Sequence, residues 1–531
     1  MEVLILFVLV VVLLVIGAPI AVALGLASVL VIAFFSTDSM SSVALQLFNA
    51  SQNYILLAIP FFILASNFMS TGGVARRIIR VAIASVGHFR GGLAMASVMS
   101  CMLFAALSGS SPATVVAIGS IAITAMRQVG YSRDFAAGVI ANAGTLGILI
   151  PPSIIMVVYA AATNVSVGRM FLAGLLPGLV AGLMLMGAIY VVARRRNLPR
   201  EDWKGFSEIF MAGRDAGWGL FLIFIIIGGI YGGAFTPTEA AAVAAVYSGL
   251  VALFVYRDMG PLVGVPWLPP DAPPEVVTGF KATVYALALL LLWLIVGFFF
   301  FSGFSATTRL WIGLTMAAVV LIAYPVLRGK QSPMASLYGL PVWGRNLWLV
   351  LKALLPAAIH QDTFKVLTDS ARTTVMLMFI IVNALLFAHV LTAERIPNAI
   401  TDWMLGMGFN WFTFLIAVNI LLLLGGQFME PSGLLLIVAP VVFPIAMQLG
   451  VDPIHLGIIM VVNMEIGMIT PPIGLNLFVT SGITGMSLTQ VVRAALPFVA
   501  VLMVFLVLVT YIPLMSTAVP YALMGPEPMT P

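Results

Sequence analysis

The sequence has little charge, a single cysteine and only four histidines. Cys101 has no second cysteine for an intramolecular disulfide and no neighbouring metal ligands, which argues against a disulfide-stapled domain and a cysteine-based metal site. Only 8% of the 531 residues are charged, whereas 62% are hydrophobic. This balance excludes an ordinary soluble globular protein.

Long polar segments are also missing, so the sequence offers no soluble domain of useful size. Apolar runs of about 20 residues, the length that crosses a bilayer, recur along the chain, and its mean hydropathy is +1.15. The net charge of +5 comes from Lys and Arg in short connections, where it orients a protein in a lipid bilayer and indicates no nucleic acid partner. The sequence therefore predicts an all-α polytopic membrane protein.

Two distant stretches of the chain share one pattern. In the first, Ser-Gly-Ser-Ser-Pro at 108–112 is followed by an Asn and Gly pattern at 142–147 and by a Pro-Pro pair. In the second, residues 426–432 are followed by a similar Asn, Gly and Pro-Pro pattern at 463–472. The two Pro-Pro pairs are 320 positions apart. Paired apolar segments interrupted by Gly and Pro predict the binding site of a secondary transporter.

The distribution of charge predicts how the two copies are oriented. Arginines near residues 76–90 form a stretch without acidic residues, which indicates the cytoplasmic side. Between Arg90 and Arg127 there is room for two half-helices of about 15 residues, about 22 Å each, that enter and return on the same side. Counting spans forward gives the second hairpin an outer base, so that the two hairpins point at each other as an inverted repeat.

The predicted organisation has six parts along the chain. They are an N-terminal membrane segment (1–52), a first repeat (53–195) with a cytoplasmic-side hairpin (91–126) and a broken helix (135–164), connecting helices (196–256), an insertion with two extra transmembrane helices (257–352), a second repeat (353–515) with a periplasmic-side hairpin (411–447) and a broken helix (454–483), and a C-terminal tail (516–531).

Broken helices explain how such residues bind ions. Carbonyls freed at a Gly or Pro break, with hydroxyls such as those of Ser108, Thr145 and Thr470, are hard oxygen ligands that suit Na⁺. Half-helix N-termini present N–H groups and a partial positive charge that favour a carboxylate. One break is therefore able to bind a coupling ion and an anionic substrate together.

Simpler roles compete with these assignments. Ser and Gly also allow close packing between membrane helices, and Asn142 and Asn463 are either ligands or interhelical hydrogen-bonding groups. Glu239 follows Thr236-Pro237-Thr238 and is expected to stabilise a helix start. Glu430 and Glu465 are expected to carry protons, balance a cation or pair with a polar neighbour.

The chain resembles the large membrane subunit of tripartite ATP-independent periplasmic (TRAP) transporters over nearly its whole length, except the predicted insertion. The matching motifs are Gly72-Gly73-Val74-Ala75-Arg76-Arg77, Val86-Gly87-His88-Phe89-Arg90-Gly91-Gly92, Ser108-Gly109-Ser110, Ile150-Pro151-Pro152-Ser153, Phe235-Thr236-Pro237-Thr238-Glu239-Ala240, Asp369-Ser370-Ala371-Arg372-Thr373-Thr374 and Thr470-Pro471-Pro472-Ile473-Gly474.

The resemblance implies an elevator-type importer in the bacterial inner membrane, driven by a Na⁺ gradient and having two re-entrant hairpins and two broken transmembrane helices. A periplasmic binding protein would deliver an organic acid, such as a C4-dicarboxylate, and a small membrane subunit of about four helices would brace the large one. No organic cofactor and no catalytic residue are expected.

In the family, Na⁺ sites lie where each hairpin tip meets its broken helix. The resemblance thus implies Na⁺ ligands at Ser108, Gly109, Ser110, Asn142, Thr145, Gly147, Gly425, Gly426, Met429, Gly467 and Thr470. The candidate substrate-binding residues beside them are Ser111, Pro112, Pro151, Pro152, Glu430, Pro431, Ser432, Pro471 and Pro472.

The sequence departs from the family pattern in two places and leaves two other functions open. The second tip has Glu430-Pro431 where the family has Asp-Pro, and the 257–352 insertion replaces a short connection. One alternative is a stand-alone carboxylate carrier driven by Na⁺ or H⁺. The other is an intramembrane enzyme with Ser108 or Ser110 as nucleophile and His389 or His455 as base.

Overall fold

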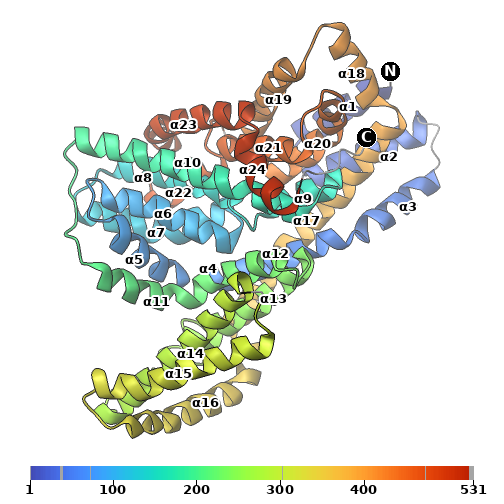
Figure 1. Ribbon diagram of the computed structural model, residues 1–531. Coiled ribbons are helices and arrows are strands. Elements are labelled where there is room, and N and C mark those ends of the chain that lie inside the picture. Colours follow the sequence, from blue (N-terminus) through green and yellow to red (C-terminus); the bar gives the residue numbers. More distant parts are fainter. Residues whose placement is uncertain (1, 36–39, 72, 302, 473, 526–531) are drawn as a thin grey trace. The chain divides into compact units, whose positions relative to one another are not determined.

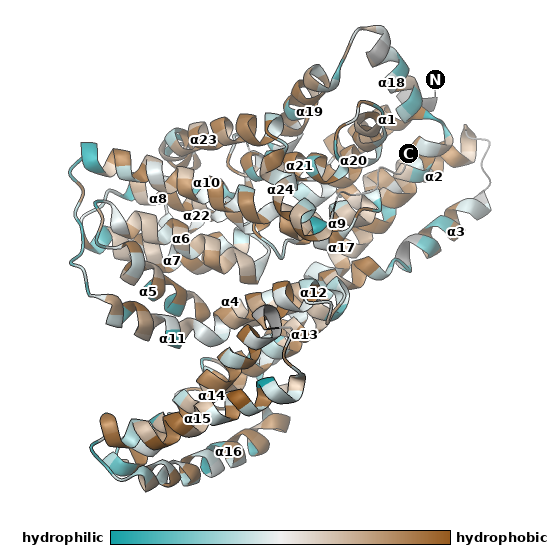
Figure 2. Ribbon diagram, viewed as in Figure 1, coloured by the Kyte–Doolittle hydropathy of each residue, from teal (hydrophilic) through white to brown (hydrophobic). Residues whose placement is uncertain are grey.

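The computed structural model describes residues 2–35, 40–71, 73–301, 303–472 and 474–525, and within these ranges it has no strand (Figure 1). The all-α polytopic fold is thus confirmed. Eight helical segments among the described residues are long and apolar enough to cross a membrane, and they are predominantly brown in Figure 2. They are Val167–Arg195, Phe206–Tyr231, Pro237–Val255, Pro274–Gly297, Ala306–Leu327, Gln361–Ala393, Pro431–Gln448 and Leu488–Tyr511.

The chain divides into two compact units. Unit 1 comprises residues 1–251 and 366–531, and unit 2 comprises residues 252–365. The α-helices of unit 1 are α1 (Glu2–Val15), α2 (Ile20–Phe34), α3 (Met40–Ser51), α4 (Ala58–Thr71), α5 (Val74–Val86), α6 (Gly92–Ser108), α7 (Ser111–Gln128), α8 (Arg133–Ala143), α9 (Ile154–Thr163), α10 (Val167–Arg195), α11 (Phe206–Ile223), α12 (Gly229–Tyr231), α13 (Pro237–Leu250), α17 (Gln361–Ala393, which begins in unit 2), α18 (Ile396–Gly406), α19 (Trp411–Gly426), α20 (Pro431–Gln448), α21 (Pro453–Gly467), α22 (Leu475–Thr484), α23 (Leu488–Tyr511) and α24 (Leu514–Met524).

The N-terminal apolar run forms two helices. Gly17 adopts a φ of +88°, a left-handed conformation that suits glycine, and Pro19 is the N-cap of α2. Helices α1 and α2, of 14 and 15 residues, pack against each other. Each is about 22 Å long, shorter than a typical 30 Å hydrocarbon core.

Two helical hairpins form in unit 1 where Gly-rich sequence interrupts an apolar run. In the first, α6 packs along α7, and Gly109 between them has a φ of +59°. In the second, α19 packs along α20, and Pro431 begins the returning helix. Helix α20 also has the length of a candidate span, so length alone does not distinguish a hairpin arm from a crossing helix.

A broken helix follows each hairpin. The first consists of α8, the 3₁₀ turn η2 (Gly144–Ile148) and α9. The second consists of α21 and α22, with Pro471 and Pro472 between them. Both Pro-Pro peptide bonds are cis. A polar residue caps the first half-helix in each copy, Ser132 for α8 and Asp452 for α21. The two copies therefore follow the same order of elements.

The two copies pack reciprocally within unit 1. Helix α9 of the first copy lies against α20 of the second, and α22 of the second lies against α7 of the first. Likewise α8 packs on α23, and α10 packs on α21. Exchange of equivalent partners is the mark of a two-fold relation. The repeat inferred from the sequence is thus a repeat in space.

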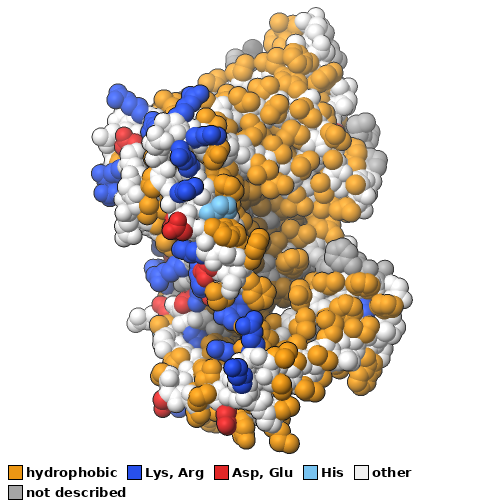
Figure 3. All heavy atoms as spheres, turned by 60° about the vertical axis from the view of Figure 1, so that its left-hand side comes forward, with side chains coloured by type: hydrophobic (Ala, Val, Ile, Leu, Met, Phe, Trp, Pro, Cys, Tyr) orange, Lys and Arg blue, Asp and Glu red, His pale blue; other side chains and the backbone are white. Residues whose placement is uncertain are grey.

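Basic side chains gather on one face of unit 1, where α5, α11 and the end of α10 lie (Figure 3). Arg80 of α5 contacts two carboxylates of α11, Glu208 at 2.9 Å and Asp215 at 2.6 Å. These exposed ion pairs contribute at most about 1 kcal/mol each. The face is the one that the charge distribution assigns to the cytoplasm.

Unit 2 contains most of the predicted insertion. Its regular elements are the π-helical turn η4 (Val251–Val255, which begins in unit 1), α14 (Pro274–Phe300), α15 (Ala306–Leu327), the 3₁₀ segment η5 (Pro333–Gly339) and α16 (Leu340–Ala358). Helices α14 and α15 pack along each other. The unit is organised around buried Arg257, whose Nη2 donates to Asn346 Oδ1 at 2.7 Å and whose guanidinium lies 4.2 Å from the Trp267 ring centroid.

Substitution of Arg257 by alanine is expected to destabilise unit 2 by about 3 kcal/mol, because it removes a cation–π contact and leaves three buried or partly buried acceptors without their donor. Those acceptors are the carbonyls of Phe254 and Val265 and the amide oxygen of Asn346. The measurement is the temperature at which the purified protein in detergent loses its monodisperse peak. Arg328→Ala, which removes an exposed arginine of the same unit, is the control and should leave that temperature unchanged.

Candidate functional site

The first hairpin tip is pressed against the first broken helix. A Cβ atom on Gly109 would lie 2.6 Å from the carbonyl oxygen of Pro152, and one on Gly147 would lie 2.8 Å from that of Ser110. Glycine is therefore required at both positions, because the backbones of the tip and the broken helix approach too closely for a side chain. Since the tip meets the helix at its break, the hairpin ends where the helix is interrupted.

Polar side chains tie this tip to the second copy. The Ser111 hydroxyl donates to the Gly144 carbonyl at 2.9 Å and accepts a hydrogen bond from Asn476 Nδ2 at 2.7 Å. Asn476 is the second residue of α22, so the start of that helix lies at the start of α7. The Ser108 hydroxyl is 2.9 Å from that of Thr114 within the tip itself.

The second tip meets its own broken helix through glycine. A Cβ on Gly467 would lie 2.8 Å from Gly426 Cα, and one on Gly426 would lie 3.1 Å from Gly467 Cα. The Thr470 hydroxyl donates to the Ile466 carbonyl at 2.7 Å. The two breaks differ in exposure, since Pro151 and Pro152 are buried whereas Pro471 and Pro472 are exposed.

One hydrogen bond joins the two broken helices directly. Thr145 Oγ1 lies 2.7 Å from Glu465 Oε1, and both residues are fully buried. The same hydroxyl lies 2.7 Å from the Asn142 carbonyl. Side chains 320 residues apart in sequence thus meet where the two copies of the repeat join.

Several buried oxygen atoms at these breaks have no hydrogen-bond partner among the described residues. They are Asn142 Oδ1, Asn463 Oδ1, Glu465 Oε2, Asn476 Oδ1 and Thr480 Oγ1. The Nδ2 atom of Asn142 donates to the Gly138 and Ala495 carbonyls, and that of Asn463 donates to Asn419 Oδ1. An unpaired oxygen inside a protein is costly. A bound cation would satisfy such oxygens, and this donor set suits Na⁺.

The helix N-termini around the breaks are not equivalent. Glu430 caps α20 by accepting a hydrogen bond from the Gly433 N–H at 3.2 Å, and it also accepts one from the Ser432 hydroxyl. Ser153 caps α9. In contrast, α7 and α22 have no side-chain cap. A carboxylate ligand is therefore favoured at α7 and α22, whereas Glu430 would repel it at α20.

The other candidate residues have structural contacts. Glu239 and Thr236 form a capping box at the start of α13, which confirms the expected structural role. The His455 ring nitrogens face the Ser516 hydroxyl and the Thr510 carbonyl, and the Ser108 hydroxyl faces that of Thr114. Among the described residues, no group of three or more His, Cys, Asp or Glu side chains is placed to hold a metal ion.

The structure adds residues that the sequence did not single out. Asn476 and Thr480 lie one turn apart on α22 and are fully buried, as is Thr114 on α7. The available signal was a polar residue recurring at helical spacing inside an apolar run. The assigned roles of the candidate Na⁺ and substrate ligands stay predictions.

Comparison with known sequences identifies a family and close relatives. The family described as "Tripartite ATP-independent periplasmic transporter, DctM component" matches residues 7–261 and 268–515. The chain is 55% identical over 531 residues to the C4-dicarboxylate TRAP transporter large permease protein DctM of Vibrio cholerae serotype O1, covering 100% of both chains. It is 51% identical over 498 residues to the protein of the same name from Pseudomonas aeruginosa, covering 94% of this chain and 93% of the relative.

A third relative is longer than this chain. The isethionate TRAP transporter permease protein DctMQ of Oleidesulfovibrio alaskensis is 33% identical over 501 residues, which cover 94% of this chain but only 63% of the relative. The family match also runs through residues 268–352. Residues 262–267 of the predicted 257–352 insertion lie outside that match, and the insertion stays a prediction.

Proposed function

We propose that this chain, which belongs to the DctM family of tripartite ATP-independent periplasmic transporters, imports a C4-dicarboxylate across the bacterial inner membrane with Na⁺ as the coupling ion. The substrate class is supported by the names of the Vibrio and Pseudomonas relatives, at 55% and 51% identity. Import would depend on a periplasmic binding protein and a small membrane subunit. The DctMQ relative supports the second partner, because about a third of its length has no counterpart in this chain.

The observation that carries Na⁺ coupling is the set of unpaired buried oxygens at both breaks. Asn142 lies in the first half of one broken helix and Asn463 in the first half of the other, and each has an amide oxygen without a partner among the described residues. The Glu465 carboxyl lies between the copies. When Na⁺ is bound, it would supply positive charge at both breaks, and this charge would favour an anionic substrate between them.

The carboxylates of the substrate are expected to bind near Ser111 and Asn476. There the N-termini of α7 and α22 meet, neither of them with a side-chain cap, and the positive ends of the two helix dipoles favour a negative charge. At the second tip Glu430 already fills this role for α20, so we assign Glu430 to helix capping and cation balance. Ser432, which donates to Glu430, supports that arrangement.

Alternating access would follow from movement of the two hairpins with their broken helices. These elements hold one another by backbone contacts at Gly147 and Gly467 and by the Thr145–Glu465 hydrogen bond. Such contacts favour motion as one body, which is the elevator mechanism implied by the family resemblance. The rest of the permease and its small membrane subunit would form the frame against which this body moves.

The decisive test is uptake of labelled succinate into proteoliposomes that contain this chain, its small subunit and its binding protein. Uptake is expected only with an inward Na⁺ gradient and with the binding protein present. Omission of the binding protein is the control for the alternative function, a stand-alone carrier driven by Na⁺ or H⁺. Uptake without that protein, or uptake that follows a proton gradient and ignores Na⁺, would contradict the proposal.

A further inference from the structure

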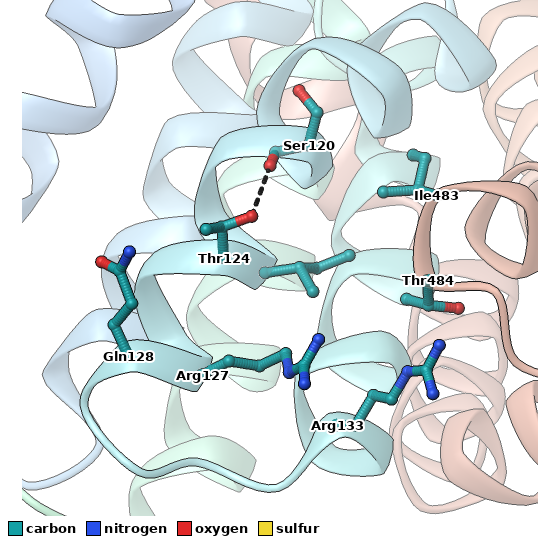
Figure 4. A pocket seen from close by; sticks show the side chains of 8 residues that line it. Ser120, Thr124, Arg127, Gln128, Arg133, Ile483 and Thr484 are labelled. Carbon is teal, nitrogen blue, oxygen red and sulfur yellow. Dashed lines mark hydrogen bonds between the residues drawn. The ribbon is translucent and has the colours of Figure 1, made fainter.

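A pocket of about 490 Å³ lies at the far ends of α7 and α22, away from the hairpin tip. Figure 4 shows the side chains that line it. The last turn of α7 contributes Arg127, the first turn of α8 contributes Arg133, and the end of α22 contributes Thr484. Its other lining residues are Ser120, Ile123, Thr124, Gln128 and Ile483. This lining contains two guanidinium groups and no carboxylate.

Some of the polar side chains that line this pocket already form hydrogen bonds within the protein, whereas others do not. Thr124 donates to the Ser120 carbonyl at 3.1 Å, and Thr484 donates to the Thr480 carbonyl at 2.7 Å. The side chains of Arg127, Arg133 and Gln128 make no hydrogen bond or ion pair with any other described residue. Their donors are therefore available to a ligand.

The helix dipole favours a cation at the position of Arg127 but not at that of Arg133. Arg127 lies in the last turn of α7, where a cation is favoured. Arg133 is the first residue of α8, where a cation is disfavoured by the helix dipole. Its Nη2 lies 3.1 Å from the ideal Cβ position of Gly485, which follows the last residue of α22. The side chain thus turns away from its own helix toward the pocket (Figure 4).

The chemistry of the pocket selects an oxyanion. Two guanidinium groups suit a ligand with two carboxylates, because each guanidinium is able to bind a carboxylate with two parallel hydrogen bonds. A lipid phosphate shares this chemistry. A small dianion fits the pocket better, since six of its eight lining residues are polar or charged and only Ile123 and Ile483 are apolar.

We propose that this pocket is a second binding site for the dicarboxylate, occupied on the cytoplasmic side as the substrate leaves. The inference rests on the proposed function and extends it. Helices α7 and α22 meet at Ser111 and Asn476 at one end and line the pocket at the other. The substrate would thus pass along one helix pair, from their uncapped N-termini to Arg127 and Arg133.

Protection of an engineered cysteine tests the site without requiring transport. In a Cys101→Ala background, Thr124→Cys places one thiol in the pocket, and its reaction with neutral N-ethylmaleimide is timed in phosphatidylcholine nanodiscs at constant Na⁺ and ionic strength. Succinate is expected to slow labelling at concentrations at which acetate does not. Arg127→Gln with Arg133→Gln should raise the half-protecting succinate concentration at least about tenfold.

Charge-matched and lipid controls complete the test. Arg194→Gln with Arg195→Gln removes two exposed charges from the last turn of α10 and should leave protection intact. Equal protection by acetate, or protection that survives loss of Arg127 and Arg133, would overturn the site. Protection by added phosphatidylglycerol that succinate cannot displace would assign the pocket to a lipid headgroup and overturn it too.

The labelling result and the uptake result are independent. Na⁺-dependent and binding-protein-dependent uptake by the wild-type chain together with absent protection would reject only the second site. Protection by succinate together with uptake that ignores Na⁺ would retain the site and reject the proposed coupling.

Discussion

Gly467→Ala is expected to reduce Na⁺-driven succinate uptake roughly a hundredfold, the loss typical of a displacement of about 1 Å at a site of fixed geometry. The new Cβ would lie 2.8 Å from Gly426 Cα and 2.9 Å from its carbonyl oxygen. Because these are backbone atoms, they cannot rotate aside as a flexible side chain does. The hairpin tip must therefore move away from the break, and with it the oxygens proposed to bind Na⁺.

The same substitution at an open position provides the control. Gly482 lies in α22 and has no atom within 4 Å of an added Cβ, so Gly482→Ala should transport as the wild type does. Gly426→Ala, whose Cβ would lie 3.1 Å from Gly467 Cα, should be impaired less than Gly467→Ala. Initial rates are compared at equal amounts of monodisperse protein. A wild-type rate for Gly467→Ala would disprove the requirement for close approach at this tip.

The sequence predicted the two copies of a hairpin followed by a broken helix, because the residues that form them act on their own stretch of backbone. Gly, Pro and Ser at the tips and breaks act on their own backbone, so their spacing alone indicates where helices end. The observed tips at Gly109 and Gly426 and the breaks before Pro152 and Pro472 follow this logic. Charge counting predicted which face is basic for the same reason, since it needs only the order of residues.

The contacts between the two copies of the repeat could not be predicted from the sequence. The Thr145–Glu465 and Ser111–Asn476 hydrogen bonds join residues that are 320 and 365 positions apart, and they depend on how whole helices pack. Asn476, which lies in an apolar run, was therefore not predicted as a site residue. The difference between buried Pro152 and exposed Pro472 likewise arises from packing, because the two local sequences are similar.

Apolar length alone does not determine whether a segment crosses the membrane as one helix. The N-terminal run is long enough for one span, but Gly17 and Pro19 divide it into two helices that pack on each other. In the second hairpin, α20 has 18 residues and passes as a crossing helix by length, although its tip contacts a break. Apolar length measures what a helix is able to span, whereas turns and contacts decide its path.

Removal of the Glu465 carboxyl is expected to have the second large effect. Its Oε1 accepts a hydrogen bond from Thr145, and its Oε2 has no partner among the described residues, which leaves that oxygen for a cation. Glu465→Gln keeps an oxygen for Thr145 but removes the carboxylate. We expect the Na⁺ concentration for half-maximal uptake to rise at least about tenfold, because a charged ligand is replaced by a neutral one in a medium of low dielectric constant.

Thr145→Val distinguishes the hydrogen-bonding role of Glu465 from its role in binding the cation. Valine has nearly the shape of threonine but leaves Glu465 Oε1 without its hydrogen-bond donor. This variant should therefore lower the maximal uptake rate more than it changes the Na⁺ concentration for half-maximal uptake. Both parameters come from Na⁺ titrations of succinate uptake in the same proteoliposomes. If Glu465→Gln alters only protein stability and leaves Na⁺ dependence as in the wild type, the carboxyl is a structural link between the copies, and the cation is held by the oxygens of Asn142 and Asn463 alone.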